Sequence, residues 1–325
     1  MKTLMVLVLW LMASCAFAQE AILSGNLSSV GSDTLGNLMS LWGESFNRQN
    51  PGVNVQIQAA GSSTAPTALA AGAAELGAMS RPMQAPERQL FEERYGYPPL
   101  AIPVAMDALV VVVSQDNPLP GINVQQLDAI FSATRLCGAH IAPKTWGDLQ
   151  LTQPSWAHKR IQRFGRNSAS GSWGFFKQQA LCNGDFRSDV AEYPGSAAVV
   201  QAVAGTLNSI GYASAGFHIS GVKTLPVARQ GNEWIAPTAE NIRSGVYPYA
   251  RPLYIYVNKT PDKRLEPLTR AFLQLALSDE GQQLVAQAGY LPLSVEQRKQ
   301  ALQLLEFQAT KKADVPDLDT KSASK

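Results

Sequence analysis

The sequence predicts an α/β protein of two lobes, in which each lobe is a mixed sheet flanked by helices. Segments with strand-like and helix-like patterns alternate along most of the 325 residues, which is typical of α/β domains. Residues 103–113 are apolar apart from one carboxylate, and such a run suits a strand that is buried on both faces of its sheet. The chain is long enough for two domains of ordinary size.

The first part of the chain shows the alternation clearly. From Thr34 to Asn47, large apolar side chains recur every three or four positions, as on one face of a helix. Asn50-Pro51-Gly52 ends this helix, and the next five residues alternate between apolar and polar as a half-buried strand does. The expected elements are strands over residues 21–30, 53–57 and 76–79 and helices over residues 34–47 and 65–74.

The second part continues the alternation, with two interruptions. The expected elements are strands over residues 103–113, 160–165, 210–213 and 247–257, and helices over residues 124–131, 172–181, 195–203, 265–277 and 281–287. Proline-containing breaks lie near residues 113–120 and 242–252. If both breaks are crossings between lobes, lobe I consists of residues 20–113 plus 253–308 and lobe II of residues 114–252.

Both ends of the chain are expected to lie outside these lobes. Residues 1–18 read as a secretory signal peptide, with a basic start, a short apolar run and the Ala16-Phe17-Ala18 motif that predicts cleavage after Ala18. The protein is therefore expected in the periplasm or secreted. Cys15 offers lipidation as a minority alternative, because methionine stands at position 12 where leucine is usual. Residues 309–325 are polar and charged and are expected to form a disordered tail.

Two cysteines, Cys137 and Cys182, remain after the predicted cleavage. An exported protein meets an oxidising compartment, so an even number of cysteines predicts one disulfide between them. The alternative is a pair of free buried thiols.

Composition and motifs argue against several classes of function. The formal net charge is +2, from 27 basic and 25 acidic residues, and no basic stripe is present, so no nucleic-acid partner is expected. The three histidines have no metal-ligand spacing, and neither a Gly-x-Ser-x-Gly elbow nor a phosphate-binding Gly-rich lysine loop occurs. We therefore expect a monomeric binding protein that is not an enzyme and needs no metal or cofactor.

Three Gly/Ser/Thr turns, each followed by a helix pattern, carry the functional signal. They are Gly31-Ser32-Asp33-Thr34 (turn one), Gly61-Ser62-Ser63-Thr64 (turn two) and Ser168-Ala169-Ser170-Gly171-Ser172 (turn three). Helix starts carry free N–H groups and the positive end of the helix dipole, so they favour anions. Each turn alone is explained as an N-cap. Three of them together predict a pocket for a small oxyanion.

Arginine strengthens this interpretation, because a guanidinium presents a forked pair of donors that suits two oxygens. Arg166 precedes turn three, and Arg81 follows the strand over residues 76–79. The candidate hydroxyl donors are those of Ser32, Thr34, Ser63, Ser170 and Ser172. Turns one and two fall in lobe I and turn three in lobe II, so the ligand is expected between the lobes, where hinge closure can bury it.

These segments resemble successive motifs of periplasmic phosphate-binding proteins. The resemblance runs in order from about residue 24 to residue 295, and its most specific element is Arg166-x-x-x-Ser170-Gly171-Ser172; residues 247–257 resemble the hinge strand of that family. It implies the two-lobe periplasmic solute-binding (Venus-flytrap) fold of the type II solute-binding proteins. It also implies phosphate contacts from all three turns and from Arg166, and delivery of inorganic phosphate to the permease subunits of an ABC transporter.

One position departs from that family's pattern. Enteric-type members carry a carboxylate that accepts the proton of hydrogen phosphate, and Ser80 stands at that position here. Sulfate has no proton to offer, so a carboxylate acceptor would separate the two anions. Asp107, the lone acid in its apolar strand, is the expected acceptor and Asp33 the reserve, although either side chain is also explained as a structural helix cap.

Three other functions remain open at this point. The same scaffold can hold another oxyanion, such as sulfate or molybdate. A secreted phosphatase or phosphate scavenger can use a similar oxyanion pocket. An adhesion or signalling role is also compatible with the sequence, because fold does not determine function.

Overall fold

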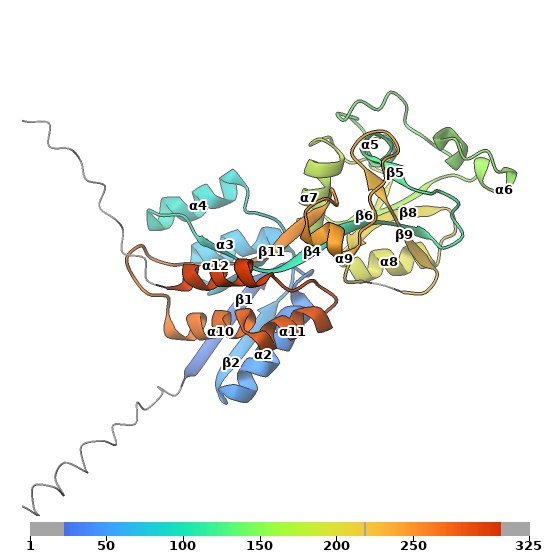
Figure 1. Cartoon of the computed structure of the whole chain (residues 1–325). Helices are drawn as coiled ribbons and strands as arrows, with labels where there is room; N and C mark the ends of the chain where they lie inside the picture. Colours follow the sequence, from blue (N-terminus) through green and yellow to red (C-terminus); the bar gives the residue numbers. More distant parts are fainter. Residues whose placement is uncertain (1–22, 218, 307–325) are drawn as a thin grey trace, which may run out of the picture.

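The computed structural model describes residues 23–217 and 219–306 (Figure 1). The expected signal peptide and the expected tail over residues 309–325 lie outside the described residues. Within the described part, no helix combines the length and the apolar character needed to cross a bilayer.

The secondary structure alternates as the sequence predicts, in two lobes joined by the long strand β4 (Leu100–Ser114). Lobe I contains strands β1 (Ser24–Gly31), β2 (Gly52–Gln58), β3 (Leu76–Met79) and β11 (Ala250–Val257), the short helix η2 (Ser62–Thr64), and helices α2 (Gly36–Gln49), α3 (Ala65–Ala71), α4 (Ala85–Tyr95), α10 (Pro267–Leu277), α11 (Asp279–Gln287) and α12 (Val295–Leu305). Lobe II contains strands β5 (Ile122–Asn123), β6 (Gln162–Arg166), β7 (Val190–Tyr193), β8 (Ser209–Ser214), β9 (Val222–Leu225) and β10 (Val227–Ala228), the short helix η3 (Trp146–Leu149), and helices α5 (Val124–Phe131), α6 (Pro154–Ala157), α7 (Gly171–Ala180), α8 (Ser196–Ala204) and α9 (Ala239–Arg243).

Both lobes are built on mixed sheets, which confirms the predicted fold class. In lobe I, β1 is parallel to β2 and β3, whereas β11 is antiparallel to β3 and β4. In lobe II, β6 is parallel to β7 and β8, whereas β4 is antiparallel to β8 and β9. The strands follow the order β2-β1-β3-β11-β4-β8-β6-β7. Turns one, two and three follow the carboxyl ends of β1, β2 and β6, the usual place for a ligand in such sheets.

The sheet of lobe I carries apolar side chains on both faces. Helices α2, α10 and α11 contribute to a core with Leu27, Leu76 and Leu253. Helices α3 and α4 pack in a separate cluster with Met79 and Tyr256. A sheet covered by helices on both faces presents only its strand ends to the opposite lobe, so these ends are available for a site.

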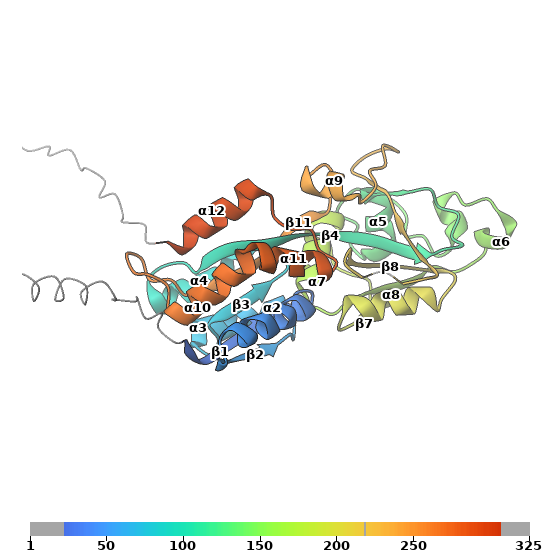
Figure 2. The same ribbon diagram turned by 60° about the horizontal axis from the view of Figure 1, so that its bottom comes forward.

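Strand β4 runs from one lobe into the other, as Figure 2 shows. Its residues from Leu100 to Ala108 pair with β11, and those from Leu109 to Val113 pair with β8. Ala105 belongs to the core of lobe I, and the residues from Ala108 to Val113 belong to the core of lobe II. The first crossing therefore lies near Asp107. The sequence predicts this crossing near residues 113–120, because an unbroken apolar strand gives no local sign of where its neighbours change.

The return crossing lies at the start of β11. Tyr249 packs in the core of lobe II and Leu253 in the core of lobe I, so the chain changes lobes between these two residues. Arg251 stands directly opposite Asp107 in the antiparallel register of β11 and β4. The two crossing strands are thus neighbours, and they form one hinge.

The predicted disulfide between Cys137 and Cys182 is confirmed. It joins the loop after α5 to the loop after α7 within lobe II. The bond is therefore a staple inside one lobe and does not restrict the movement of one lobe relative to the other.

Removing this disulfide with the double variant Cys137→Ser and Cys182→Ser is expected to lower the free energy of unfolding by about 2–4 kcal/mol. The reason is that the bond closes a loop with a sequence separation of 45 residues, which restricts the unfolded chain. Urea unfolding of both proteins measures the loss. An unchanged midpoint would show that the staple contributes nothing to stability.

Candidate anion-binding site

The three Gly/Ser/Thr turns meet where the two lobes touch. The N–H of Gly61 donates to the carbonyl of Gly31 at 2.8 Å, which joins turns one and two, and the N–H of Ser63 donates to the carbonyl of Ala169 at 3.1 Å, which joins turns two and three. Gly61 has φ of +120°, and a Cβ there would lie 2.5 Å from the carbonyl oxygen of Ala169. Only glycine fits this backbone position, so the sequence itself permits the approach of the lobes.

The hydroxyls of turn one are buried and have no partner. Ser32 and Thr34 are 1% and 0% exposed, and neither Ser32 Oγ nor Thr34 Oγ1 makes a hydrogen bond within the described residues. The Tyr290 hydroxyl donates to the Thr34 carbonyl at 2.5 Å, and burial raises the pKa of Tyr290, so it remains a donor. A buried hydroxyl without a partner is costly, so these two atoms are candidate contacts for a polar ligand.

The hydroxyl oxygens of turn three accept hydrogen bonds from protein groups, which leaves their hydrogens free to be donated to a ligand. Ser170 caps α7, and its Oγ accepts the N–H of Ser172 at 3.1 Å. The Oγ of Ser172 accepts from Nη2 of Arg251 at 2.9 Å. A hydroxyl that accepts one bond can still donate another. Ser170 and Ser172 can therefore both donate to an anion at the start of α7.

Arg166 is fully buried at the end of β6 and crosses to the opposite lobe. Its Nη1 donates to Ser196 Oγ at 3.0 Å and its Nη2 to the Pro194 carbonyl at 2.8 Å. Nη2 also lies 2.6 Å from Oδ1 of Asp33 in an ion pair. The backbone N–H of Arg166 donates to the Tyr212 hydroxyl at 3.1 Å. Turn one and β6 are therefore joined by a charge pair in which Asp33 is 16% exposed and Arg166 is inaccessible.

A second buried ion pair lies at the hinge. Oδ2 of Asp107 accepts from Nε and Nη2 of Arg251 at 3.0 and 2.8 Å, and Oδ1 accepts from the Ser214 hydroxyl at 2.8 Å. Both side chains are almost completely buried. Nη1 of Arg251 makes no hydrogen bond within the described residues. The site thus contains two guanidinium–carboxylate pairs whose charges balance, beside the positive ends of α2 and α7.

Comparison with known proteins identifies the family. A family model described as the PBP superfamily domain matches residues 17–280. The chain belongs to the PBP superfamily. It is 55% identical over 283 residues to the phosphate-binding protein PstS of Pseudomonas aeruginosa, a match that covers 87% of each chain.

Two solved structures superpose on this fold. A putative phosphate ABC transporter substrate-binding protein from Clostridium perfringens, with bound phosphate, superposes with a TM-score of 0.69 at 22% identity; the match covers 83% of this chain and all of that one. A possible phosphate-binding protein from Planctomyces limnophilus gives a TM-score of 0.64 at 25% identity, covering 87% and 98%. The two-lobe architecture described above is the one that these proteins share.

Arg81 and Ser63 are placed differently from the other predicted site residues. Arg81 forms a two-bonded ion pair with Glu87, at 2.7 Å to each carboxylate oxygen, and donates to Ser63 Oγ at 3.2 Å. Ser62 is the hydroxyl of turn two that faces turn three, since a Cβ at Gly171 would lie 2.3 Å from Ser62 Oγ. Arg81 thus pairs with a carboxylate of its own lobe, whereas Arg166 pairs with Asp33 of the opposite lobe.

Several polar neighbours of the site were not singled out from the sequence: Ser62, Ser196, Ser214, Arg251 and Tyr290. Arg251 lies in the Ala-Arg-Pro-Leu-Tyr segment that resembles the family's hinge strand, which was the one available signal for it. Ser80, where the resembled family has a carboxylate, is fully buried, and its N–H donates to Ser62 Oγ at 3.1 Å. Ser80 therefore supports turn two.

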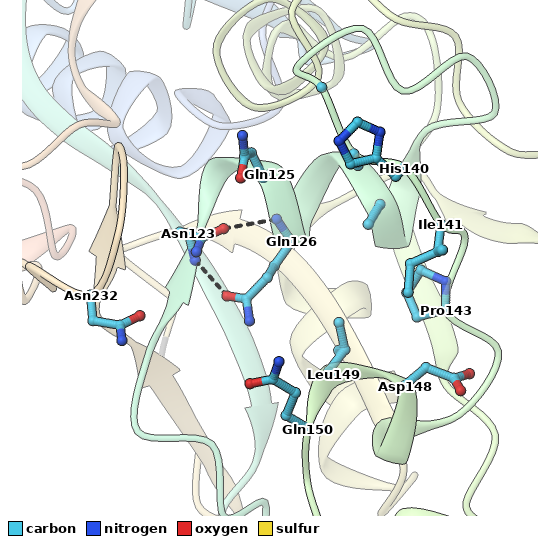
Figure 3. Close-up of a pocket in the computed structure, with 13 residues that line it drawn as sticks. Asn123, Gln125, Gln126, His140, Ile141, Pro143, Asp148, Leu149, Gln150 and Asn232 are labelled. Atoms are coloured by element: carbon cyan, nitrogen blue, oxygen red, sulfur yellow. Dashed lines mark hydrogen bonds between the residues drawn. The ribbon is translucent and has the colours of Figure 1, made fainter.

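A separate pocket of about 330 Å³ lies in lobe II, between α5 and η3 (Figure 3). Side-chain amides line much of it, and Asn123 and Gln126 exchange reciprocal hydrogen bonds at one margin. None of the three turns contributes to this pocket. Within residues 23–217 and 219–306, no group of three or more potential metal-binding side chains is present.

Proposed function

We propose that this protein binds inorganic phosphate between its lobes and delivers it to the permease subunits of an ABC transporter, without chemical change. One observation carries the proposal: the three turns meet at a place where the buried hydroxyls of Ser32 and Thr34 have no partner, and the buried Arg166 reaches the same turn through Asp33. A tetrahedral oxyanion needs many short donors from several directions, and this arrangement supplies them. The 55% identical relative, which is named a phosphate-binding protein, supports the choice of phosphate.

We also propose an oligomeric state, a location and a closing movement for the protein. The protein acts as a monomer in the periplasm after cleavage behind Ala18. Helix starts contribute from each side of the hinge, and Arg166 contributes from lobe II, so closure of the lobes completes the hydrogen-bond shell. The closed face is what a permease recognises.

Anion binding is tested by thermal unfolding and calorimetry on protein that has been unfolded and refolded to remove any carried ligand. Phosphate at 100 times its dissociation constant is expected to stabilise the fold by about 2.7 kcal/mol. Sulfate and molybdate at the same concentration are expected to have little effect. A larger shift with sulfate or molybdate would make that anion the ligand, and turnover of a phosphate ester would favour an enzyme.

We propose Asp33, the reserve candidate, as the acceptor of the phosphate proton. Asp33 lies between Ser32 and Thr34, whose hydroxyls lack partners, whereas both oxygens of Asp107 already accept hydrogen bonds. Asp33→Asn is expected to lower the phosphate-to-sulfate affinity ratio at least tenfold, because the amide removes the repulsion of sulfate and no longer favours a protonated anion. Calorimetry with both anions near neutral pH measures the ratio, and an unchanged ratio would exclude Asp33.

A further inference from the structure

We propose that Arg251 of the hinge strand is a second guanidinium ligand of the bound anion, and that Asp107 is the residue that positions it. This inference rests on the proposed oxyanion function but goes beyond it. It makes the hinge a part of the binding site. It also gives Asp107 a role other than that of proton acceptor.

The orientation of the Arg251 guanidinium follows from its partners. A guanidinium is planar and carries its five N–H groups in fixed directions. The edge formed by Nε and Nη2 faces Asp107. The remaining hydrogen of Nη2 is directed to Ser172 Oγ at 2.9 Å. The end that carries Nη1 and Nη2 therefore points toward turn three and away from the carboxylate.

Nη1 is the atom that this arrangement leaves for a ligand. It is buried and makes no hydrogen bond within the described residues, although the other donors of the same side chain are engaged. Ser32 Oγ and Thr34 Oγ1 are likewise buried and make no hydrogen bond within the described residues. A buried charged donor without a partner is costly, and an oxyanion that Ser172 also contacts would provide that partner.

Asp107 fixes Arg251 in this orientation. Its two oxygens accept two N–H groups of Arg251 and the hydroxyl of Ser214. The Phe175 ring, from α7, lies 5.3 Å from the guanidinium carbon. The guanidinium is therefore held by Asp107 of β4 and by α7, and Ser214 of β8 in turn holds Asp107. Because Nη1 points away from Asp107, an anion on Nη1 lies on the far side of the guanidinium from that carboxylate.

The location has a mechanical consequence. Asp107 and Arg251 lie opposite each other on the two crossing strands, and Ser172 and Ser214 belong to lobe II. Arg251 and Ser172 are already joined by a hydrogen bond at 2.9 Å, so an anion held by both residues would add a second link between the hinge and the start of α7.

The test uses calorimetric phosphate affinities of Arg251→Gln, Arg251→Lys and the double variant Asp107→Asn with Arg251→Gln. Arg251→Gln is expected to weaken phosphate binding roughly 10- to 100-fold, as expected for a lost charge-assisted hydrogen bond, and Arg251→Lys by a smaller factor. The double variant leaves no uncompensated buried charge, so it should fold and remain weak. Wild-type affinity in the double variant would overturn the role of Arg251. Failure of the wild-type protein to bind any oxyanion would instead overturn the proposed function.

Asp107→Asn separates positioning from proton acceptance. If Asp107 only positions Arg251, Asp107→Asn is expected to weaken the binding of phosphate and of sulfate by the same factor. The ratio of the two affinities is then unchanged. A proton acceptor would change the ratio. Phosphate affinity at the wild-type level together with an altered ratio would overturn the positioning role of Asp107. The double variant separates positioning from a structural defect: if Asp107 acts through Arg251, the double variant binds phosphate as weakly as Arg251→Gln alone, whereas a structural defect would add to the loss.

Discussion

Replacing Arg166 by alanine is expected to weaken phosphate binding at least about 30-fold, because losing a buried, hydrogen-bonded charge costs about 2–5 kcal/mol. Arg166 is inaccessible to solvent and joins the two lobes through Asp33. Alanine would remove the donors and leave the carboxylate without its partner. Isothermal calorimetry with phosphate on refolded protein measures the loss.

Arg163 provides a matched control on the same strand. It is also buried, but its guanidinium donates to the carbonyls of Ile130 and Pro143 at 2.5 and 2.6 Å and touches none of the three turns. Arg163→Ala is expected to lower stability while the folded protein keeps its phosphate affinity. Equal affinities in Arg166→Ala and the wild-type protein would show that the anion lies elsewhere.

Replacing Gly171 by alanine is expected to weaken phosphate binding by roughly 5- to 150-fold, corresponding to about 1–3 kcal/mol for an overpacked contact. The added Cβ would lie 2.3 Å from Ser62 Oγ and 2.4 Å from Ser80 Oγ. Gly171 is the first residue of α7, in lobe II, whereas Ser62 and Ser80 lie in lobe I. The clash therefore opposes contact between the lobes and leaves each lobe intact.

The stability of the ligand-free protein separates this effect from misfolding. Alanine suits a helix position better than glycine does. The midpoint temperature of unfolding without phosphate is therefore expected to be unchanged or slightly higher. Gly195→Ala is the control, because Gly195 precedes α8 and a Cβ there meets nothing within 4 Å. Normal phosphate affinity in Gly171→Ala would mean that the lobes bind the anion without this contact.

Local pattern predicted most of the fold because the main elements carry strong periodic signals. The strand β3 and the helix α5 have the predicted bounds, Leu76–Met79 and Val124–Phe131. Helices α4 and α12 were not predicted. Only Phe91 of α4 is buried, and only Ala301 and Leu305 of α12, so neither helix has a broad apolar stripe for periodicity to reveal.

The sequence by itself predicted the chemistry that we propose for the site. Gly/Ser/Thr turns before helix patterns, with Arg166 ahead of the third, indicate donors for an oxyanion wherever they lie. Tertiary structure decided which charges meet. Arg166 pairs with Asp33 from the opposite lobe, and Arg251 pairs with Asp107 at a sequence separation of 144 residues. The physical reason is that hydrogen-bond donors and helix starts are local properties of a segment, whereas charge pairing depends on strand order and register, which no short segment contains.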